Sequence, residues 1–251
     1  MLDIIDNILN NKINAVSLDI FDTILLRNAA SEEERFYKIA IGYQEKLAES
    51  GFYFSLKDLF YLRCACHHMA YRASPLVNGV REPGIRLIVE ALCSSLSIDP
   101  LFVPKLISID VDYEVHNLRV NWRLLRDVKV LQNYGVSVFL ISDMYLRESD
   151  LNFIITRLCP GFAFEKIYVS SDFSASKHSN GGLFDIFLAE QKYNASEVMH
   201  IGDNYCSDVL QAQRKGIACI YLPRNKVFVV NRTIRKYFFE FIKKRDFYDN
   251  L

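Results

Sequence analysis

The sequence predicts an α/β protein with a doubly wound parallel sheet and a helical insertion after the first strand. Two observations predict this class. At the start of the chain and again after residue 120, short apolar runs alternate with segments of helical period, as in βαβ units. Between residues 29 and 119, helical patterns follow one another without a convincing strand. We therefore expect an α/β core that is interrupted by an all-helical insert.

The strands of the core are predicted from short apolar runs with polar ends. The first run begins at Ala15 and stops at Asp19, and runs of this length suit strands buried on both faces of a parallel sheet. Similar runs predict the remaining strands, at residues 136–141, 166–170, 198–201 and 217–222. Apolar spacing of helical period predicts the helices of the core, at residues 2–11, 148–158, 183–193 and 208–215. This alternation favours a parallel sheet with helical crossovers.

The helices outside the core are predicted from their first residues and their periodicity. Ser31 is followed three residues later by Glu34, which is a capping box and opens a helix that extends to about residue 48. Pro83 is a residue type favoured in a first helical turn. Helical patterns cover residues 55–73, 83–96, 100–134 with a break, and 231–245.

These patterns divide the chain into three parts. Residues 1–28 and 120–223 are expected to form the α/β core, and residues 29–119 a helical cap. Residues 224–251 form a basic aromatic tail with eight Lys or Arg residues. We expect the tail to dock on the protein itself, and a partner protein or an anionic membrane surface is the alternative.

Composition excludes several classes of protein. Thirty basic and thirty acidic residues give a formal net charge of zero, which argues against a nucleic-acid-binding surface. No apolar run approaches the roughly 18 residues of a transmembrane helix. The first residues carry acids where a secretory signal carries bases. We therefore expect a cytoplasmic protein whose six cysteines are reduced.

Polar motifs lie at or near the ends of the predicted strands and recur in order along the chain. They are Asp19-x-x-Asp22-Thr23, Ser142-Asp143, Lys177 and Gly202-Asp203-x4-Asp208. Because parallel strands bring their carboxyl ends to one edge of the sheet, we expect these side chains to converge there. Several carboxylates around a single lysine are tolerable only with a divalent cation, and oxygen ligands favour Mg²⁺.

With these motifs in this order, the chain resembles the haloacid dehalogenase-like (HAD) hydrolase superfamily over residues 13–222. The helical insert is similar to the C1-type cap of that superfamily. The resemblance implies that Asp19 attacks phosphorus and forms an aspartyl phosphate. It implies Mg²⁺ ligands at Asp19, at Asp203 and at the backbone carbonyl of Phe21, with Asp208 bound directly or through water.

The same resemblance assigns the phosphate contacts. Ser142 and nearby backbone N–H groups would bind the phosphoryl oxygens, and Lys177 would neutralise Asp19 and the phosphate. Thr23 and Asp143 would lie beside the bound phosphate. The residues of the first two motifs also resemble those of a subgroup of predicted HAD hydrolases. Members of this subgroup are often encoded beside, or fused to, bacterial glycosyltransferases of surface-polysaccharide synthesis. This implies a sugar phosphate or a related metabolite as substrate.

One position departs from the phosphatase pattern. HAD phosphatases place an aspartate two residues after the nucleophile to protonate the leaving group, and this chain has Phe21 there. Three alternative donors of that proton are the next residue, Asp22, then Asp143, and a water molecule. Dehalogenases of the superfamily also have an aromatic residue at this position, but they use no metal. The acidic fourth motif indicates a metal site and therefore disfavours a dehalogenase.

The sequence thus predicts a Mg²⁺-dependent phosphatase that acts on a small phosphorylated metabolite through Asp19. The first alternative is a metal-independent dehalogenase with the same nucleophile. The second is a catalytically degenerate HAD module that binds a phosphorylated ligand or a glycosyltransferase partner.

Overall fold

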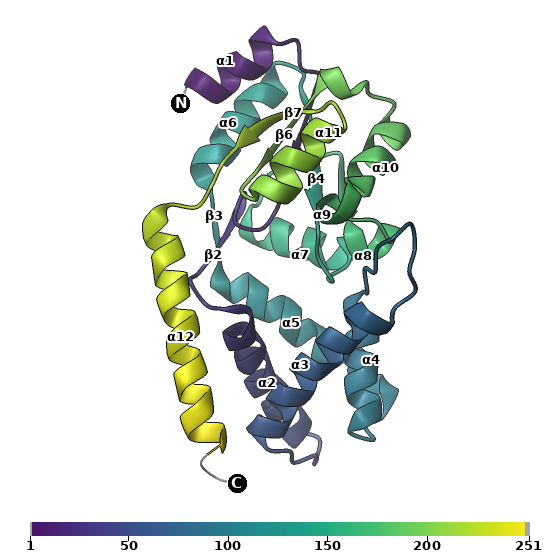
Figure 1. The fold of residues 1–251 in the computed structure, drawn as a ribbon, viewed down its shortest axis with the longest axis vertical. Coiled ribbons are helices and arrows are strands. Elements are labelled where there is room, and N and C mark those ends of the chain that lie inside the picture. The colour runs from purple at the N-terminus through teal and green to yellow at the C-terminus, as the bar shows by residue number, and fades with distance from the viewer. Residues whose placement is uncertain (1, 249–251) are drawn as a thin grey trace. The chain divides into compact units, whose positions relative to one another are not determined.

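The structure of the protein is a computed structural model, and it describes the backbone of residues 2–248 (Figure 1). Backbone contacts divide the chain into two compact units. The core unit consists of residues 1–27, 74–84 and 118–223, and the helical unit of residues 28–73, 85–117 and 224–251. The tail, which the sequence sets apart by charge, belongs to the helical unit. The segment 74–84 interrupts the helical insert and belongs to the core unit.

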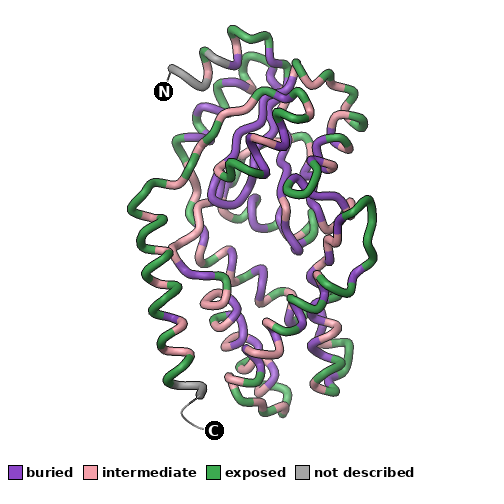
Figure 2. The backbone as a smooth tube through the Cα atoms, viewed as in Figure 1, coloured by how far each residue is buried: buried purple, intermediate pink, exposed green. Residues whose placement is uncertain are grey.

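The core unit contains a five-stranded parallel sheet with strand order β5-β4-β1-β6-β7, and the predicted fold class is confirmed. The strands are β1 (Ala15–Leu18), β4 (Ser137–Ser142), β5 (Lys166–Val169), β6 (Val198–Gly202) and β7 (Ala218–Tyr221). The central strand β1 has no exposed residue, whereas the edge strand β7 is partly open to solvent. Figure 2 shows the buried residues concentrated along the central strands.

Helices of the core unit follow the strands, as the alternating pattern predicts. They are α1 (Leu2–Asn10), α6 (Trp122–Asn133), α7 (Glu148–Leu158), α8 (Ser170–Phe173), α9 (Lys177–Asn180), α10 (Gly182–Gln191) and α11 (Gln211–Arg214). A short 3-10 turn, η2 (Ala195–Glu197), precedes β6, and a π-helical turn, η3 (Tyr205–Leu210), follows it. The apolar faces of these elements pack on the sheet, for example at Phe139, Tyr168 and Phe187.

Two short strands flank the helical insert. Strand β2 (Leu25–Arg27) pairs antiparallel with β3 (Leu118–Val120), so the chain leaves and re-enters the core unit side by side. The sequence predicts a broken helix over 100–134, and the break is β3. Strand β3 is only three residues long and pairs with a strand more than ninety residues away. The periodicity of the sequence cannot reveal such a short strand.

The helical unit contains the predicted helices of the insert and one helix of the tail. They are α2 (Glu32–Ala48), α3 (Leu56–Ala73), α4 (Ile85–Ser95), η1 (Pro100–Phe102), α5 (Val103–Asn117) and α12 (Lys226–Tyr248). Ser31 caps α2 by accepting a hydrogen bond from the Glu34 N–H at 3.2 Å, as the capping box predicts. A buried ion pair joins Arg63 to Asp110 at 2.7 Å.

Candidate active site

Asp19 lies directly after β1, the central strand of the sheet. Its backbone N–H continues the ladder by donating to the Ile201 carbonyl at 2.9 Å, which fixes the main chain at this edge. Strands β4 and β6 flank β1 on either side, so Asp19 is only 7% exposed. The central position of the strand therefore buries a carboxylate, which needs a charged partner there.

Lys177 is that partner. Its Nζ lies 2.6 Å from Asp19 Oδ1 and 2.7 Å from Asp208 Oδ1, and the lysine is 2% exposed. The sequence places Lys177 in a loop, but the structure places it at the first residue of α9, which Ser176 caps. Asp143 holds this backbone, since its two carboxylate oxygens accept the N–H groups of Lys177 and His178 at 2.8 and 2.9 Å. Asp143 thus orients the segment that carries the lysine.

Asp208 approaches the site from η3. The Asn204 side chain accepts from the first N–H groups of this turn, and the Asn204 N–H donates to Asp208 Oδ2 at 2.9 Å. A Cβ atom added at Gly202 would lie 2.3 Å from Asp208 Oδ2. Glycine is therefore required at this position, because it lets the carboxylate pass close to the end of β6.

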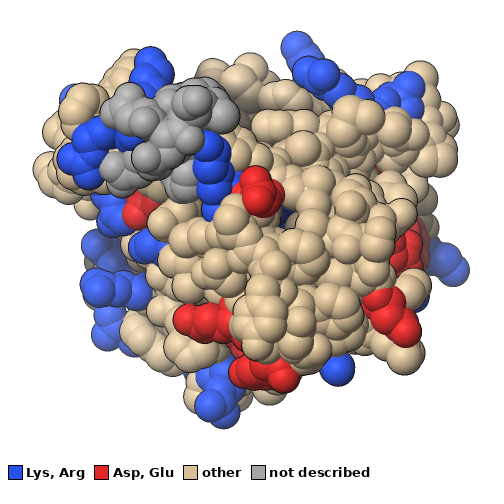
Figure 3. All heavy atoms as spheres, turned by 90° about the horizontal axis from the view of Figure 1, so that it is seen from below, with Lys and Arg blue, Asp and Glu red and all other residues tan. Residues whose placement is uncertain are grey.

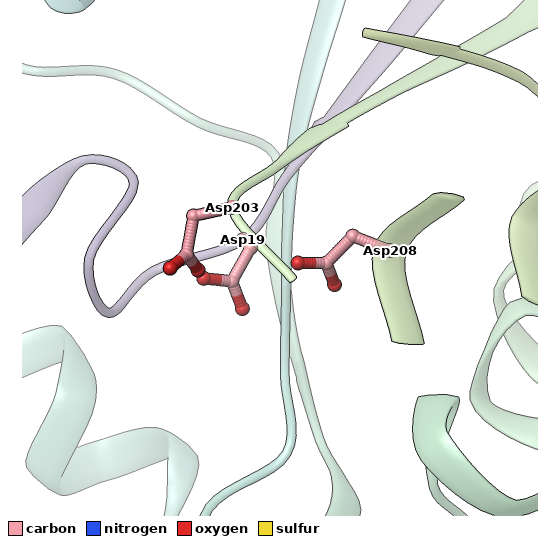
Figure 4. A group of neighbouring side chains, drawn as sticks. All are labelled: Asp19, Asp203 and Asp208. Carbon is pink, nitrogen blue, oxygen red and sulfur yellow. The ribbon is translucent and has the colours of Figure 1, made fainter. Parts of the chain in front are cut away.

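Three carboxylates converge at this edge of the sheet (Figure 4). Asp19, Asp203 and Asp208 each offer a ligand oxygen, and these atoms all lie within 4.8 Å of one another. Among the described residues, this is the one group of three or more His, Cys, Asp or Glu side chains with such spacing. A set of hard oxygen donors at this spacing fits Mg²⁺ rather than zinc.

The protonation states follow from burial and from the neighbouring charges. Burial raises the pKa of Asp19 to about 7; Lys177 opposes this shift, and Asp208 and Asp203 add to it. Burial alone would lower the pKa of Lys177, but the adjacent Asp19 and Asp208 carboxylates outweigh it and raise that pKa. Burial alone would raise the pKa of Asp208, and Lys177 and His200 lower it instead. Lys177 is therefore charged and Asp208 ionised at neutral pH.

His200 supports Asp208 from within the sheet. The sequence leaves this histidine unassigned, as a residue of a buried strand pattern. It is fully buried, with Nδ1 2.8 Å from the Ser17 hydroxyl and Nε2 3.4 Å from Asp208 Oδ1. Burial lowers the pKa of His200, so the neutral ring can donate one hydrogen bond and accept another.

The turn after Asp19 places the rest of the first motif. Asp22 has a positive φ of 63°, and its Oδ1 accepts the Arg27 N–H at 3.0 Å. Asp22 thereby closes the turn into β2. The Arg27 guanidinium lies 3.9 Å from the centroid of the Phe21 ring. Thr23 is fully buried, and its hydroxyl has no hydrogen-bond partner among the described residues.

The structure thus brings Asp19, Lys177, Asp203 and Asp208 together, and Asp143 contacts the backbone of the same lysine. Ser142 is 2% exposed at the end of β4, which pairs with β1. The phosphate-binding roles of Ser142, Thr23 and Asp143 stay predictions, as does the role of the Phe21 carbonyl. Sequence reasoning missed Glu82, which lies in the 74–84 segment of the core unit, near Asp143. No local pattern marks that residue.

Comparison with known proteins finds similarity at the level of structure. No family model matches the chain, and no curated protein is similar to it in sequence. A 2-haloacid dehalogenase of Pseudomonas syringae pv. tomato is 18% identical, with a TM-score of 0.55 over 83% of this chain and 86% of that one. A HAD phosphatase of Thermococcus onnurineus is 16% identical, with a TM-score of 0.55 over 85% and 88%. The chain has the HAD fold.

A third similar structure was solved with magnesium. It is a HAD-hydrolase of Bacillus subtilis, 12% identical, with a TM-score of 0.50 over 84% of this chain and 88% of that chain. The HAD structures similar to this chain thus include both a phosphatase and a dehalogenase. What this chain shares with these structures is the fold.

Proposed function

We propose that this protein is a Mg²⁺-dependent HAD hydrolase that removes phosphate from a small phosphorylated metabolite through Asp19. The observation that carries the proposal is the convergence of Asp19, Asp203 and Asp208 around Lys177. A carbon–halogen hydrolase needs the nucleophile and a lysine, but it has no use for two further carboxylates. A charged phosphate ester with a cation does require them.

Asp19, Asp203 and Asp208 would hold the Mg²⁺ ion, with the Phe21 carbonyl as a further ligand. When bound, Mg²⁺ supplies positive charge that screens the repulsion between phosphate oxygens and an attacking carboxylate. Lys177 adds a fixed positive charge beside the Asp19 oxygen and limits its rotation. The Thr23 hydroxyl is buried in the same motif and has no hydrogen-bond partner among the described residues, so it would be available to donate to a phosphoryl oxygen.

The reaction proceeds in two displacements at phosphorus. An Asp19 oxygen forms a bond to phosphorus while the bond to the leaving oxygen breaks, which yields an aspartyl phosphate and an alcohol. Water then attacks the aspartyl phosphate and releases inorganic phosphate and the free carboxylate. Ser142 at the end of β4 and the backbone N–H groups beside it would bind the phosphoryl oxygens during both steps.

The test is a panel of sugar phosphates and other small phosphate esters, assayed for phosphate release with Mg²⁺ or with EDTA. We expect turnover with Mg²⁺, loss of turnover with EDTA, and at least about a 10²-fold loss in Asp19→Asn because the nucleophile is absent. Asp185→Asn is the matched control, since Asp185 pairs with Lys215 on the surface. Undiminished phosphate release in EDTA or in Asp19→Asn would overturn the proposal.

Phe21 favours a second candidate function, because dehalogenases of the superfamily also carry an aromatic residue at this position. The assay for it is halide release from 2-haloacids in EDTA. Halide release that depends on Asp19 and survives EDTA would replace the phosphatase proposal. Tight phosphate-ester binding without any turnover, unaffected by Asp19→Asn, would indicate a degenerate binding module.

A further inference from the structure

Helix α12 of the tail packs on the helical unit through one face. Phe239 is 9% exposed, and its ring centroid lies 5.7 Å from that of Tyr37 and 6.1 Å from that of Phe60. Lys243 Nζ lies 2.5 Å from a Glu33 carboxylate oxygen, and Arg235 pairs with Glu34. Aromatic contacts and ion pairs therefore fix which side of α12 faces the other helices.

The opposite side of α12 carries a row of exposed apolar side chains, which we call the outer stripe. Its members are Val227 (69% exposed), Val230 (55%), Ile234 (61%), Tyr237 (71%), Phe238 (63%) and Phe241 (63%). They recur every three or four residues, so they lie on one face of the helix. Large exposed apolar patches of this kind mark interaction surfaces rather than ordinary solvent-facing sides.

Basic residues accompany the outer stripe. Lys226 precedes it, Lys236 lies within the same stretch, and Lys244 and Arg245 follow it; all four are exposed. Glu240 is the single acid between them, and it contacts Lys243 at 3.2 Å. Figure 3 shows Lys and Arg side chains gathered at the left of the view. The surface around the stripe is therefore cationic.

This charge decides what can cover the stripe. A second copy of the chain that paired through the same face would bring Lys and Arg against Lys and Arg, which is unfavourable. An anionic bilayer surface is complementary to both features, since aromatic and aliphatic side chains enter the headgroup boundary while basic side chains contact lipid phosphates. No described helix is both long and apolar enough to cross a membrane, so the contact would be peripheral.

We propose that α12 is a peripheral membrane-binding helix that inserts its outer stripe into the surface of an anionic lipid bilayer. The proposal does not depend on the enzymatic reaction. The test is co-sedimentation of the full chain with phosphatidylcholine vesicles, with and without phosphatidylserine, at low and high salt. We expect binding only with phosphatidylserine, and weaker binding at high salt because the charges are screened.

Two variants separate the stripe from its surroundings. In Ile234→Ser/Phe238→Ser, binding should fall at least about tenfold because apolar area in the bilayer is lost. Val229→Ser is the matched control: Val229 is 52% exposed on α12 but lies off the stripe, and its variant should bind like the parent. Because all three positions are exposed, circular dichroism should show unchanged folding. Absence of binding to anionic vesicles, or a stripe-dependent dimer in light scattering, would overturn the proposal.

A second inference rests on the proposed phosphatase function and concerns the 74–84 segment. This segment leaves the helical insert and packs in the core unit. Val77 and Val80 exchange backbone hydrogen bonds of 2.9 and 3.0 Å around Asn78 and Gly79, whose positive φ angles of 50° and 82° form a tight turn. The Asn180 amide donates to the Asn78 carbonyl at 3.4 Å, which ties the turn to the last residue of α9.

Glu82 is the titratable residue that this segment carries to the sheet edge. Its half-buried carboxyl group lies close to the side chains of Ser170 and Ser176, which are 0% and 1% exposed. Ser176 directly precedes Lys177, and Asp143 is the charged neighbour of Glu82. Burial raises the pKa of Glu82 to about 7, and Asp143 adds to the shift. Glu82 therefore carries a proton over part of the neutral range.

The proposed reaction lacks an acid at the usual position, which is Phe21. The other carboxylates of the motifs are engaged as acceptors: Asp22 accepts the Arg27 N–H, and both oxygens of Asp143 accept backbone N–H groups. Asp22 and Asp143 thus already have backbone partners that hold their carboxylates in place, which leaves Glu82 as the candidate for the acid.

We infer that Glu82 protonates the leaving group in place of the acid missing at Phe21. When Asp19 bonds to phosphorus and the phosphorus–oxygen bond breaks, the Glu82 proton passes to the departing oxygen, directly or through one water. The products are the alcohol, the aspartyl phosphate and the Glu82 carboxylate. The water that then attacks the aspartyl phosphate returns a proton to Glu82 and restores the starting state.

The test compares leaving groups. For Glu82→Gln, turnover of an alkyl phosphate should fall by about 10²–10⁴-fold, because its leaving oxygen needs a proton. Turnover of p-nitrophenyl phosphate should fall less than about tenfold, since nitrophenolate leaves without protonation. Glu190→Gln, on the surface of α10, is the matched control and should change neither rate.

Equal losses on both substrates, or no loss on either, would refute the role of Glu82. If Glu82→Gln fails to fold, Glu82→Asp serves instead, with retained folding and the same dependence on the leaving group expected. The absence of turnover in the parent protein with both substrates would instead refute the phosphatase proposal, so the two failures are distinguishable.

Discussion

Replacement of Lys177 by Met tests how strongly the buried carboxylates of the site depend on the positive charge of the lysine. Lys177→Met keeps a long unbranched side chain but removes the ammonium group that lies 2.6 Å from Asp19 and 2.7 Å from Asp208. The three side chains are 2%, 10% and 1% exposed, so water cannot replace the lost cation. Removing one partner of a buried ion pair costs about 3–5 kcal/mol of unfolding free energy.

The assay is urea unfolding in EDTA followed by tryptophan fluorescence. The single tryptophan, Trp122, lies in α6, so its signal reports the core unit. Lys166→Met is the control: Lys166 pairs with Glu190 at side-chain exposures of 31% and 41%, and loss of such a pair costs about 0–1 kcal/mol. Mg²⁺ should stabilise Lys177→Met more than the parent, because it replaces the missing positive charge. A loss no larger than the control's would refute the reasoning.

The other predictions concern single side chains. Gly202→Ala should displace Asp208 and raise the Mg²⁺ concentration for half-maximal phosphatase activity about 10–100-fold, measured by Mg²⁺ titration of the rate. Arg63→Met leaves the buried Asp110 carboxylate uncompensated and should destabilise the helical unit by about 3–5 kcal/mol in urea unfolding followed by circular dichroism. Burial lowers the pKa of His67 to about 3, so unfolding free energy should fall below pH 6.5 by up to about 1.4 kcal/mol per pH unit, and His67→Phe should flatten this slope.

Each of these predictions has a result that contradicts it. Gly84→Ala, where an added Cβ meets no atom within 4 Å, should leave the Mg²⁺ titration unchanged, and an equal effect there would contradict the role of Gly202. Full stability of Arg63→Met would mean that the pair is not structural. For His67, the sign is that of a group whose folded pKa is depressed: the unfolded chain binds the extra proton below pH 6.5. A parent slope that His67→Phe leaves unaltered would place the acid sensitivity elsewhere.

Much of the core could be predicted from local patterns. Helix α7 covers the predicted residues 148–158, because a short apolar strand, a polar turn and a helical period follow one another there. Asp19, Asp203 and Asp208 converge as expected because parallel strands end at a common edge. The strand pattern places Asp19 and Asp203, whereas Asp208 also depends on the turn η3 that follows β6.

Features that depend on distant partners, or on a cap that the helical period does not mark, could not be predicted. The sequence indicates a helix from residue 208, but the turn η3 begins at Tyr205 because Asn204 caps it with its side chain. Helix α12 extends from 226 to 248, beyond the predicted 231–245. Its contacts with other helices of the helical unit stabilise a helix that is longer than its periodicity indicates. No local sequence pattern marks Glu82 as a site residue. Its position in the core unit results from a segment in the middle of the helical insert that packs in that unit.

The division of the chain has a consequence for biosynthesis. Helix α2 is made early, yet the unit to which it belongs also contains α12, which follows all the other described helices in chain order. Until then, Tyr37 and Phe60 lack the aromatic ring of Phe239 that contacts them in the finished protein. All strands of the α/β sheet are therefore made before α12, whereas the helical unit can reach its final packing only once α12 has been made.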